Sequence, residues 1–405
     1  MKSLIIVLLL FPVMAIHARD IYVNNLTGAD NNSGLTVDKP YKTIKKAVSE
    51  VKPGDIIHLV NTGSPYKESL VLNDVNGTPE NRITIDGNGS TLSGCQALNL
   101  SEWKEVSPGL YKNSLFYAAN RFVPDYMRIY YFLFDGRMNR MGRSRKGPCA
   151  PFKKPGELSE KEWTFTESDS SFYIKINPAK KLDDYHIEQP VRSNAVAVSG
   201  NTSYVTVKNL ICTHVYNDGF GLTGTAKKLR FENIQSHFCG DDGISAHVSV
   251  QYEVFGFVSI GNATGIADSG NSDTYYDGVV IKDCVGTDLF FINERPGEAT
   301  HTIKNVLVLC NAFRPVYLTV QKPDGHMDVK MENVLIRGDK KRDTDSTFRM
   351  EGHTDLYTRD CSFIGLKYLL QGKVAHMENT VMSDTGNVTA GGADLSKISF
   401  IKAHG

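Results

Sequence analysis

The sequence has no excess of charge of either sign. Its 45 Lys and Arg residues equal its 45 Asp and Glu residues, so the formal net charge is zero. Proteins that bind nucleic acid mainly through its phosphates normally carry a basic surplus, and we therefore expect no nucleic-acid partner. After the first residues, the chain has no apolar run near the roughly 20 residues that cross a membrane. We therefore expect no membrane-embedded segment.

The seven cysteines include no CxxC pair, and their number is odd. Closely spaced pairs are typical of zinc sites and of disulfide frameworks. The scattered spacing therefore predicts single buried thiols, with no zinc site and no essential disulfide bridge.

The first 18 residues have the pattern of a secretory signal peptide. Lys2 is followed by an apolar run from Leu4 to Ile16 and then by the small residue Ala18. No Cys follows the run, so a lipid anchor is not expected. We expect cleavage after Ala18 and a secreted or periplasmic monomer in which residues 19–405 form a single domain.

One short motif recurs along the second half of the chain. Residues 205–210 read Val-Thr-Val-Lys-Asn-Leu, and residues 229–234 read Leu-Arg-Phe-Glu-Asn-Ile, 24 positions later. Apolar and polar residues alternate, which is the period of a strand and not the 3.6-residue period of a helix. A β-sandwich would need hairpin turns, whereas this motif repeats in one orientation. The pattern predicts an all-β solenoid, a right-handed parallel β-helix whose successive turns stack.

Each repeat carries a polar residue at one position. That position is occupied in turn by Asn209, Asn233, Asp283, Asn305, Asn333, Asp360 and Asn379. Asn tolerates the left-handed backbone of a sharp corner, and stacked Asn side chains form hydrogen-bonded ladders. We expect such a ladder along one corner of the coil.

A stacked coil needs a cover on its first turn, because an open sheet edge promotes aggregation. Residues 43–51 predict a short amphipathic helix with Thr43 as N-cap, followed by a strand over 56–60. This region, with Lys39-Pro40-Tyr41-Lys42-Thr43-Ile44 and Lys52-Pro53-Gly54-Asp55, resembles the N-terminal motif of the pectin-lyase-like superfamily. The resemblance implies the β-helix fold, which lyases, hydrolases and epimerases of carbohydrates share.

Residues 96–190 fit the repeat poorly and contain both tryptophans. We interpret them as an inserted, irregular β-rich region beside the groove of the coil. The region also contains a basic stretch, formed by Arg137, Arg140, Arg143, Arg145 and Lys146. This stretch is either a solvated loop or a wall that attracts an acidic polymer.

Two acidic turns repeat in register. Residues 216–222 read Tyr-Asn-Asp-Gly-Phe-Gly-Leu, and residues 240–246 read Gly-Asp-Asp-Gly-Ile-Ser-Ala. The offset of 24 places Asp242 one turn above Asp218, so both lie near Asp241 if strands are about 4.8 Å apart. Crowded carboxylates separate their pKa values, which supplies the acid and the base that glycoside hydrolysis needs. The alternative is a purely structural role for these residues, because Asp and Gly are favoured in tight turns.

The two turns resemble the active-site turns of the polygalacturonase family. The resemblance implies that Asp241 is the general acid, that Asp218 and Asp242 hold the attacking water, and that the reaction inverts the anomeric centre. The family's next turn, Gly-His-Gly, is replaced here by Ala263-Thr264-Gly265, and its Arg-Ile-Lys clamp by Val280-Ile281-Lys282. These departures argue against polygalacturonase activity itself.

Other polar residues complete the list of candidates. His247 follows the second acidic turn and is either a catalytic group or a structural corner residue. Lys282, Arg295 and Arg314 are candidate partners for an acidic sugar. The loop that we predict over 268–278 contains Asp268, Asp273 and Asp277, which either bind calcium or are solvated.

Three functions remain open. The first is a glycoside hydrolase that uses Asp218, Asp241 and Asp242 on a polysaccharide or oligosaccharide, with acidic sugars among the candidates, and requires no cofactor. The second is a polysaccharide lyase or uronate C5-epimerase, in which a Lys, His or Arg removes the proton beside a carboxylate that either Ca²⁺ or a basic group neutralises. The third is a non-catalytic, glycan-binding or structural β-helix, which would be favoured if the carboxylates were buried.

Overall fold

The computed structural model describes residues 18–115, 127–310, 312–338, 346–383, 388–390 and 399–401. Apart from Ala18, the predicted signal peptide lies outside the described residues, so its cleavage stays a prediction. Within the described ranges, no helix is long and apolar enough to cross a membrane.

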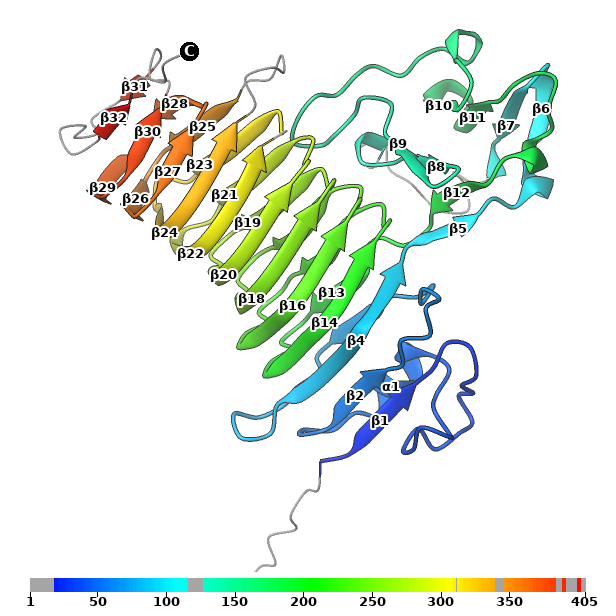
Figure 1. The fold of residues 1–405 in the computed structure, drawn as a ribbon, viewed down its shortest axis with the longest axis horizontal. Coiled ribbons are helices and arrows are strands. Elements are labelled where there is room, and N and C mark those ends of the chain that lie inside the picture. Colours follow the sequence, from blue (N-terminus) through cyan, green and yellow to red (C-terminus); the bar gives the residue numbers. More distant parts are fainter. Residues whose placement is uncertain are drawn as a thin grey trace, which may run out of the picture.

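The predicted parallel β-helix is confirmed (Figure 1). The first of its two long parallel sheets, among the described residues, consists of β1 (Asp20–Val23), β2 (Ile56–Leu59), β4 (Ile83–Ser93), β14 (Val205–Thr213), β16 (Leu229–His237), β18 (Gln251–Ile260), β20 (Asp273–Lys282), β22 (Gly297–Cys310), β24 (Gly325–Gly338), β26 (Thr354–Arg359), β27 (Ser362–Ile364), β29 (Lys373–Glu378), β30 (Val381–Ser383) and β32 (Ser399–Ile401). The second consists of β3 (Leu70–Asn73), β13 (Val196–Ser199), β15 (Phe220–Leu222), β17 (Asp242–Ala246), β19 (Thr264–Ser269), β21 (Thr287–Asn293), β23 (Arg314–Val320), β25 (Thr347–Glu351), β28 (Lys367–Leu370) and β31 (Val388–Ala390).

Alternating side chains of the two sheets fill the interior of the coil. In the first sheet Val207 pairs with Phe231, which pairs with Val254, and all three are fully buried. Because strand residues alternate between faces, each turn adds one apolar layer to a continuous core. The repeat that identifies the fold is therefore also the repeat of its core.

The predicted ladder of Asn side chains is present at one corner. The Nδ2 of Asn233 donates to the Oδ1 of Asn209 at 2.9 Å, and both residues have a left-handed backbone, with φ of 50° and 54°. Asn333 donates to Asn305 in the same way at 2.7 Å. The prediction for Asp283 is wrong: Gly278 aligns with this ladder, whereas Asp283 lies after β20 at a different corner. The Asp283-Cys284 pair resembles the polar-apolar step of the motif, but it comes after the end of β20 and not within a strand.

The first turn is covered as predicted by helix α1 (Ile44–Glu50). The side chain of Thr43 caps it by accepting a hydrogen bond from the backbone N–H of Lys46 at 3.1 Å. Ile44 and Ala47 face the coil and are fully buried.

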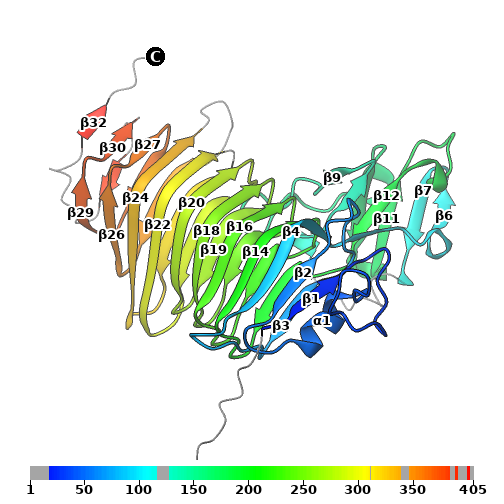
Figure 2. The same ribbon diagram turned by 60° about the horizontal axis from the view of Figure 1, so that its bottom comes forward.

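The region predicted as an insertion forms two antiparallel sheets beside the N-terminal half of the coil (Figures 1 and 2). One contains β6 (Lys104–Ser107), β7 (Leu110–Asn113), β10 (Glu162–Thr166) and β11 (Ser171–Lys175), and the other β5 (Cys95–Ala97), β8 (Phe132–Phe134), β9 (Arg137–Asn139) and β12 (Ile187–Pro190). Short 3-10 helices occupy Leu100–Glu102, Pro155–Glu157, Glu167–Asp169 and Leu182–Asp184. Trp163 is fully buried within a separate aromatic core, so the insertion has packing of its own.

The predicted loop over 268–278 is mostly strand. Asp268 belongs to β19 and points into the coil, where it is fully buried and accepts hydrogen bonds from the Tyr252 hydroxyl at 2.5 Å and the Tyr276 hydroxyl at 2.9 Å. It is therefore no ligand of an exposed calcium ion. Six cysteines with described side chains are free thiols, and five of these are buried as predicted; Cys149 is exposed.

Candidate functional site

The three acidic residues meet where the turn enters the second sheet. Phe220 pairs with Ile244, which places Asp218 beside Asp242 on the next turn, as the offset of 24 predicted. The backbone N–H of Asp242 donates to the Oδ1 of Asp218 at 3.2 Å. One carboxylate oxygen from each of Asp218, Asp241 and Asp242 lies within 4.8 Å of the others.

The glycines after the two Asp residues allow successive turns to approach. A Cβ on Gly219 would lie 2.1 Å from the Ser236 Oγ, and one on Gly243 would lie 2.6 Å from the carbonyl oxygen of Gly265. Any side chain at either position would collide with the next turn. The Asp-Gly pattern therefore sets the close stacking that brings the carboxylates together.

All three carboxyl groups are buried, with residue exposures of 2% for Asp218 and 1% for Asp241 and Asp242. Their cover comes from the insertion. The Lys146 ammonium lies 3.0 Å from the Oδ1 of Asp241 and 2.6 Å from the Oδ1 of Asp242, and its side chain is 18% exposed. The Arg145 guanidinium adds a contact of 3.4 Å to the Oδ2 of Asp241.

The loop that carries Lys146 is fixed to the coil at two points. The half-buried Arg140 donates to the carbonyl oxygens of Gly240 at 2.6 Å and Gly261 at 3.1 Å, and also to that of Cys239. Beyond it, the Thr287 Oγ1 donates to the Lys146 carbonyl at 3.1 Å. The insertion is therefore docked directly on the acidic turns.

The basic stretch, predicted as either a solvated loop or a wall for acidic polymers, instead contacts the chain itself at most of its positions. Lys146 and Arg145 are ion-paired with the carboxylates, and Arg140 is bound to backbone carbonyls. Arg143 is buried, with its guanidinium 3.9 Å from the ring centre of Phe152. Of the five residues, Arg137 and Arg145 are exposed, and Arg145 nevertheless contacts Asp241.

These contacts separate the acidities of the three carboxyl groups. Burial raises the pKa of Asp242 well above its ordinary value, with further contributions from the neighbouring charge of Asp241. Burial and the same neighbour raise the pKa of Asp218 to about 6. Burial also acts on Asp241, but the charges of Lys146 and Arg145 outweigh it and lower the pKa of Asp241. The cluster therefore contains one firmly ionised carboxylate beside groups that hold protons more readily.

Neutral side chains complete the surroundings of Asp218. The Ser245 Oγ donates to the Oδ2 of Asp218 at 2.8 Å, and the Asn217 Nδ2 donates to the same oxygen at 3.1 Å. The backbone N–H of Asp218 donates to the Oδ1 of Asn194 at 3.2 Å. Asp218 is therefore held in one orientation by both turns that flank it.

The other predicted site residues are mostly elsewhere. His247 shares the outer face of the second sheet with Ser245, but its Nδ1 contacts the Ser269 Oγ at 2.9 Å and not a carboxylate. Lys282 lies at the end of β20, beside Asp283 at 3.6 Å. Arg295 follows β21, away from the acidic turns. The structure thus brings neither Lys282 nor Arg295 to the cluster.

Arg314 does lie on the same side as the acidic residues. Asp242 aligns with Thr264, then Thr287, then Arg314 on successive strands of the second sheet. A pocket of about 320 Å³ connects this position to the cover of the cluster. It is lined by Arg145, Lys146, Gly147, Thr287, Phe290, Phe313, Arg314 and Tyr317.

Oxygen-rich groups with the spacing of a metal site occur twice among the described residues. One is the acidic cluster itself, where the Lys146 ammonium already supplies a cationic partner. The other lies on the outer face of the first sheet and combines His326, Asp328 and Asp355. The Asp355 carboxylate also pairs with Lys373 at 3.0 Å, so part of its charge is already balanced.

No protein-family model matches the chain, and no curated protein matches its sequence. Its fold is similar to that of XylC, solved in complex with xylose, with a TM-score of 0.52 at 14% identity over 89% of this chain and 69% of that one. A GH136 lacto-N-biosidase from Eubacterium ramulus matches with a TM-score of 0.45 at 12% identity, over 95% of this chain and 68% of that one. The pectate lyase Pel9A matches with a TM-score of 0.46 at 12% identity, over 95% of this chain and 80% of that one. The likeness to XylC is one of fold alone, and the parallel β-helix that the resemblance implied is confirmed by the two long parallel sheets.

Proposed function

We propose that this chain is an exported glycoside hydrolase whose catalytic groups are Asp218, Asp241 and Asp242. The observation that supports the proposal is the buried cluster of three carboxyl groups with separated acidities. Burying acids is unfavourable, and a turn needs only one Asp and one Gly. Strongly perturbed carboxyl groups beside a pocket are instead characteristic of catalytic sites.

The pKa shifts suggest which carboxyl group is the acid and which is the base. Asp242, whose pKa is raised, is the proton donor to the glycosidic oxygen as the bond from the anomeric carbon to that oxygen breaks. Asp241, whose pKa is lowered, accepts the proton of the water that forms the new bond to the anomeric carbon. This allocation differs from the one implied by polygalacturonases, in which Asp241 is the acid.

The spacing of the carboxyl groups differs from that of typical inverting enzymes. Typical inverting enzymes separate their carboxyl groups by about 6.5–9.5 Å, which leaves room for water between them. Here, the nearest oxygens lie within 4.8 Å. Direct attack by water nevertheless inverts the anomeric centre, so the proposed step is inverting, as the resemblance implied.

Substrate access requires Lys146 to move, because its ammonium contacts the two oxygens that would meet the sugar. Its four-carbon stem is flexible, and the adjoining pocket of about 320 Å³ offers space for it. Phe290 and Tyr317 in this pocket, with ring centres 5.5 Å apart, are suitable surfaces for a sugar ring.

The burial of the carboxylates favours a second candidate, a β-helix that binds glycans without cleaving them. In that case, the ion pairs would serve only to attach the insertion. A lyase is less well supported, because the charges of Asp241 and Asp242 outweigh burial and raise the pKa of Lys146, so this amine is a poor base. If Ca²⁺ neutralised the sugar carboxylate in such a lyase, the Lys146 ammonium would compete with it for the same oxygens.

The experiment is a screen of purified protein against acidic and neutral glycans, with xylan included. Hydrolysis releases reducing ends, whereas lyase cleavage also creates an unsaturated sugar that absorbs in the ultraviolet. We expect reducing ends without ultraviolet absorbance and no sensitivity to chelators. Replacing either Asp241→Asn or Asp242→Asn should lower the rate by about 10²–10⁴-fold.

Asp268→Asn is the matched control, because it alters a buried carboxyl group inside the coil and outside the cluster. It should leave the rate within a few-fold of the wild type. Full activity of Asp241→Asn and Asp242→Asn would refute the assignment. Binding of a glycan without any release of reducing ends would favour the non-catalytic candidate.

A further inference from the structure

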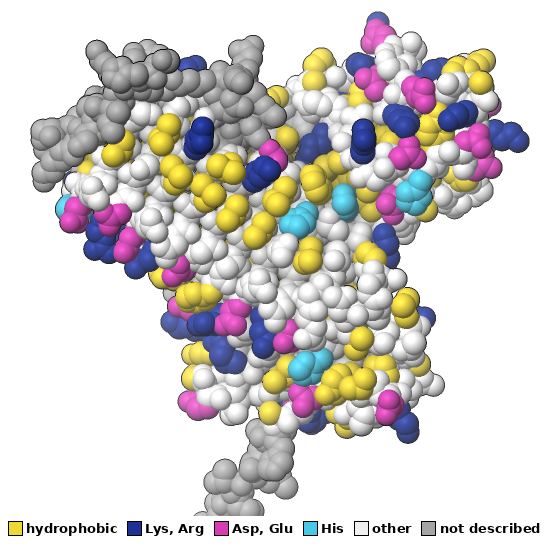
Figure 3. Space-filling model, viewed as in Figure 1, with side chains coloured by type: hydrophobic (Ala, Val, Ile, Leu, Met, Phe, Trp, Pro, Cys, Tyr) yellow, Lys and Arg dark blue, Asp and Glu magenta, His cyan; other side chains and the backbone are white. Residues whose placement is uncertain are grey.

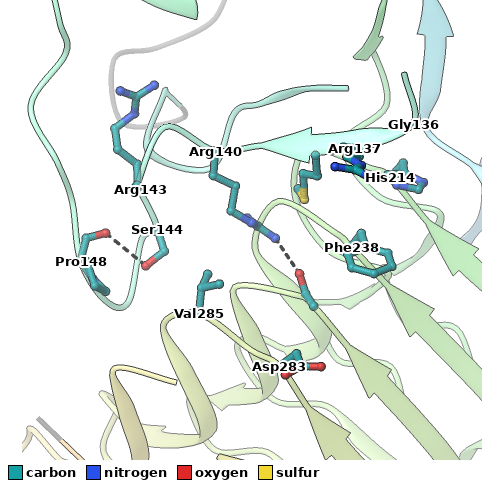
Figure 4. A pocket seen from close by; sticks show the side chains of 13 residues that line it. Gly136, Arg137, Arg140, Arg143, Ser144, Pro148, His214, Phe238, Asp283 and Val285 are labelled. Carbon is teal, nitrogen blue, oxygen red and sulfur yellow. Dashed lines mark hydrogen bonds between the residues drawn. The ribbon is translucent and has the colours of Figure 1, made fainter. Parts of the chain in front are cut away.

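A second pocket lies on the other side of the docked loop, and we propose that it binds a pyranose ring of a saccharide on the face of Phe238. The pocket has a volume of about 630 Å³ and lies between the insertion and the corner at which the first sheet ends (Figure 4). The identification of the ligand as a saccharide rests on the proposed function, but the site itself does not use the acidic cluster.

Phe238 is unusual in its backbone. It has φ of 54°, in the left-handed region, where bulky residues are rare. The other corner positions after neighbouring strands are His214, Gly261 and Asp283, which are types that tolerate this conformation better. A strained aromatic residue at a corner that Gly or Asn would suit better points to a role for the ring.

The ring is also presented to solvent. Phe238 is 42% exposed, although a large apolar side chain normally gains by burial. One side of its ring stacks on His214, with centres 5.8 Å apart and planes inclined by 16°. A Cβ on Gly261 would lie 2.5 Å from the ring, so the absence of a side chain there makes the space into which Phe238 extends. His214 therefore supports one side of the Phe238 ring, and the exposed part of the ring lines the pocket.

Polar groups lie around the exposed ring of Phe238. Figure 4 places Arg137 next to His214 and Asp283 on the opposite side of Phe238. Arg137 is exposed, and no hydrogen bond or ion pair occupies its guanidinium among the described residues. A pyranose has an apolar face of C–H groups and a rim of hydroxyls, which matches a flat apolar surface with a few polar groups at its edge.

The loop that carries Arg140 and Lys146 lies between this pocket and the acidic cluster. Arg140 lines the pocket, and its guanidinium binds the carbonyl of Gly240, the residue before Asp241. On the face shown in Figure 3, hydrophobic and His side chains gather where the coil meets the insertion. A saccharide held on Phe238 would therefore lie beside the loop that covers the carboxylates.

The test is calorimetric titration of the full chain with xylohexaose, cellohexaose and oligogalacturonate. Phe238→Gly should weaken binding of the saccharide that binds the wild type by about tenfold or more, as expected for loss of a stacking surface. Because Gly adopts the left-handed backbone freely, this variant should fold at least as stably as the wild type. Arg137→Ala should weaken binding less.

The control is Phe255→Ala, which removes an aromatic ring from the outer face of the first sheet and should leave binding unchanged. The titrations are repeated with Asp242→Asn, in which hydrolysis is blocked but this pocket is intact. Binding that persists in Asp242→Asn and disappears in Phe238→Gly supports the site, whether or not the chain hydrolyses glycans. No binding of any probe, or equal binding by Phe238→Gly and the wild type, would overturn the proposal.

Discussion

Replacing Lys146 by Met removes the charge that pairs with two buried carboxylates while keeping a flexible apolar stem. Removing one partner of a buried ion pair costs about 3–5 kcal/mol, because the remaining charge stays buried. The Lys146 side chain is 18% exposed, and Arg145 still contacts Asp241 at 3.4 Å. We therefore expect the lower end of that range, a loss of about 3 kcal/mol in the free energy of unfolding at pH 7.

The loss should depend on pH. In the wild type, the pKa of Asp241 is lowered in the folded state, so its contribution is present above the unfolded pKa and disappears as the pH falls through the folded pKa. Without Lys146, burial dominates and raises the pKa of Asp241 above its unfolded value. The folded variant then takes up a proton in mild acid, and the difference from the wild type shrinks from pH 7 toward pH 4.5.

Tryptophan fluorescence in a urea titration measures this effect, because Trp103 and Trp163 both lie buried in the insertion that carries Lys146. Lys153→Met is the matched control, since it breaks a more exposed ion pair with Glu162. Exposed pairs contribute about 0–1 kcal/mol, so the control should change little. A Lys146→Met variant as stable as the wild type at pH 7, or a deficit independent of pH, would refute the electrostatic reasoning.

Two further predictions concern the coil and the docking of the insertion. Asn233→Ala should destabilise the protein by about 1–2 kcal/mol, because it loses the hydrogen bond to Asn209 and replaces Asn by a residue that tolerates the left-handed backbone less well. Asn233→Gly should lose less, and urea denaturation measures both. Arg140→Met removes the donors to three backbone carbonyls and should make the loop around Lys146 susceptible to limited proteolysis at protease concentrations that leave the wild type intact.

The sequence contained most of the information about the coil, because the same few contacts recur on every turn. The offset of 24 between Asn209 and Asn233 predicted both the corner ladder and the approach of Asp218 to Asp242. The error at Asp283 has a local cause. An Asp-Cys pair that follows an apolar strand looks the same in the sequence at either corner of the coil. Only the strand register, which places Gly278 opposite Asn305, shows that Gly278 and not Asp283 belongs to the corner with the Asn ladder.

The contacts of the insertion were not predictable in this way, because they occur once and join residues far apart in the sequence. Lys146 reaches Asp241 across 95 positions, and no repeat sets that distance. A signal was nonetheless present, since a run of basic residues and a cluster of acids are expected to pair when both are partly buried. Interpreting the run as an open wall for acidic polymers overlooked that the nearest acids belong to the chain itself.

The ion pairs also couple the coil and the insertion electrostatically. The coil alone would place three carboxyl groups in one small patch, where mutual repulsion and burial both favour protonation. Only the cations of the loop keep Asp241 ionised while Asp242 holds a proton more readily, and that difference is what acid and base catalysis requires. The β-helix therefore sets the spacing of the carboxyl groups, whereas the insertion sets their charges. Changes in the loop should accordingly alter the chemistry of the cluster without changing a residue of the coil.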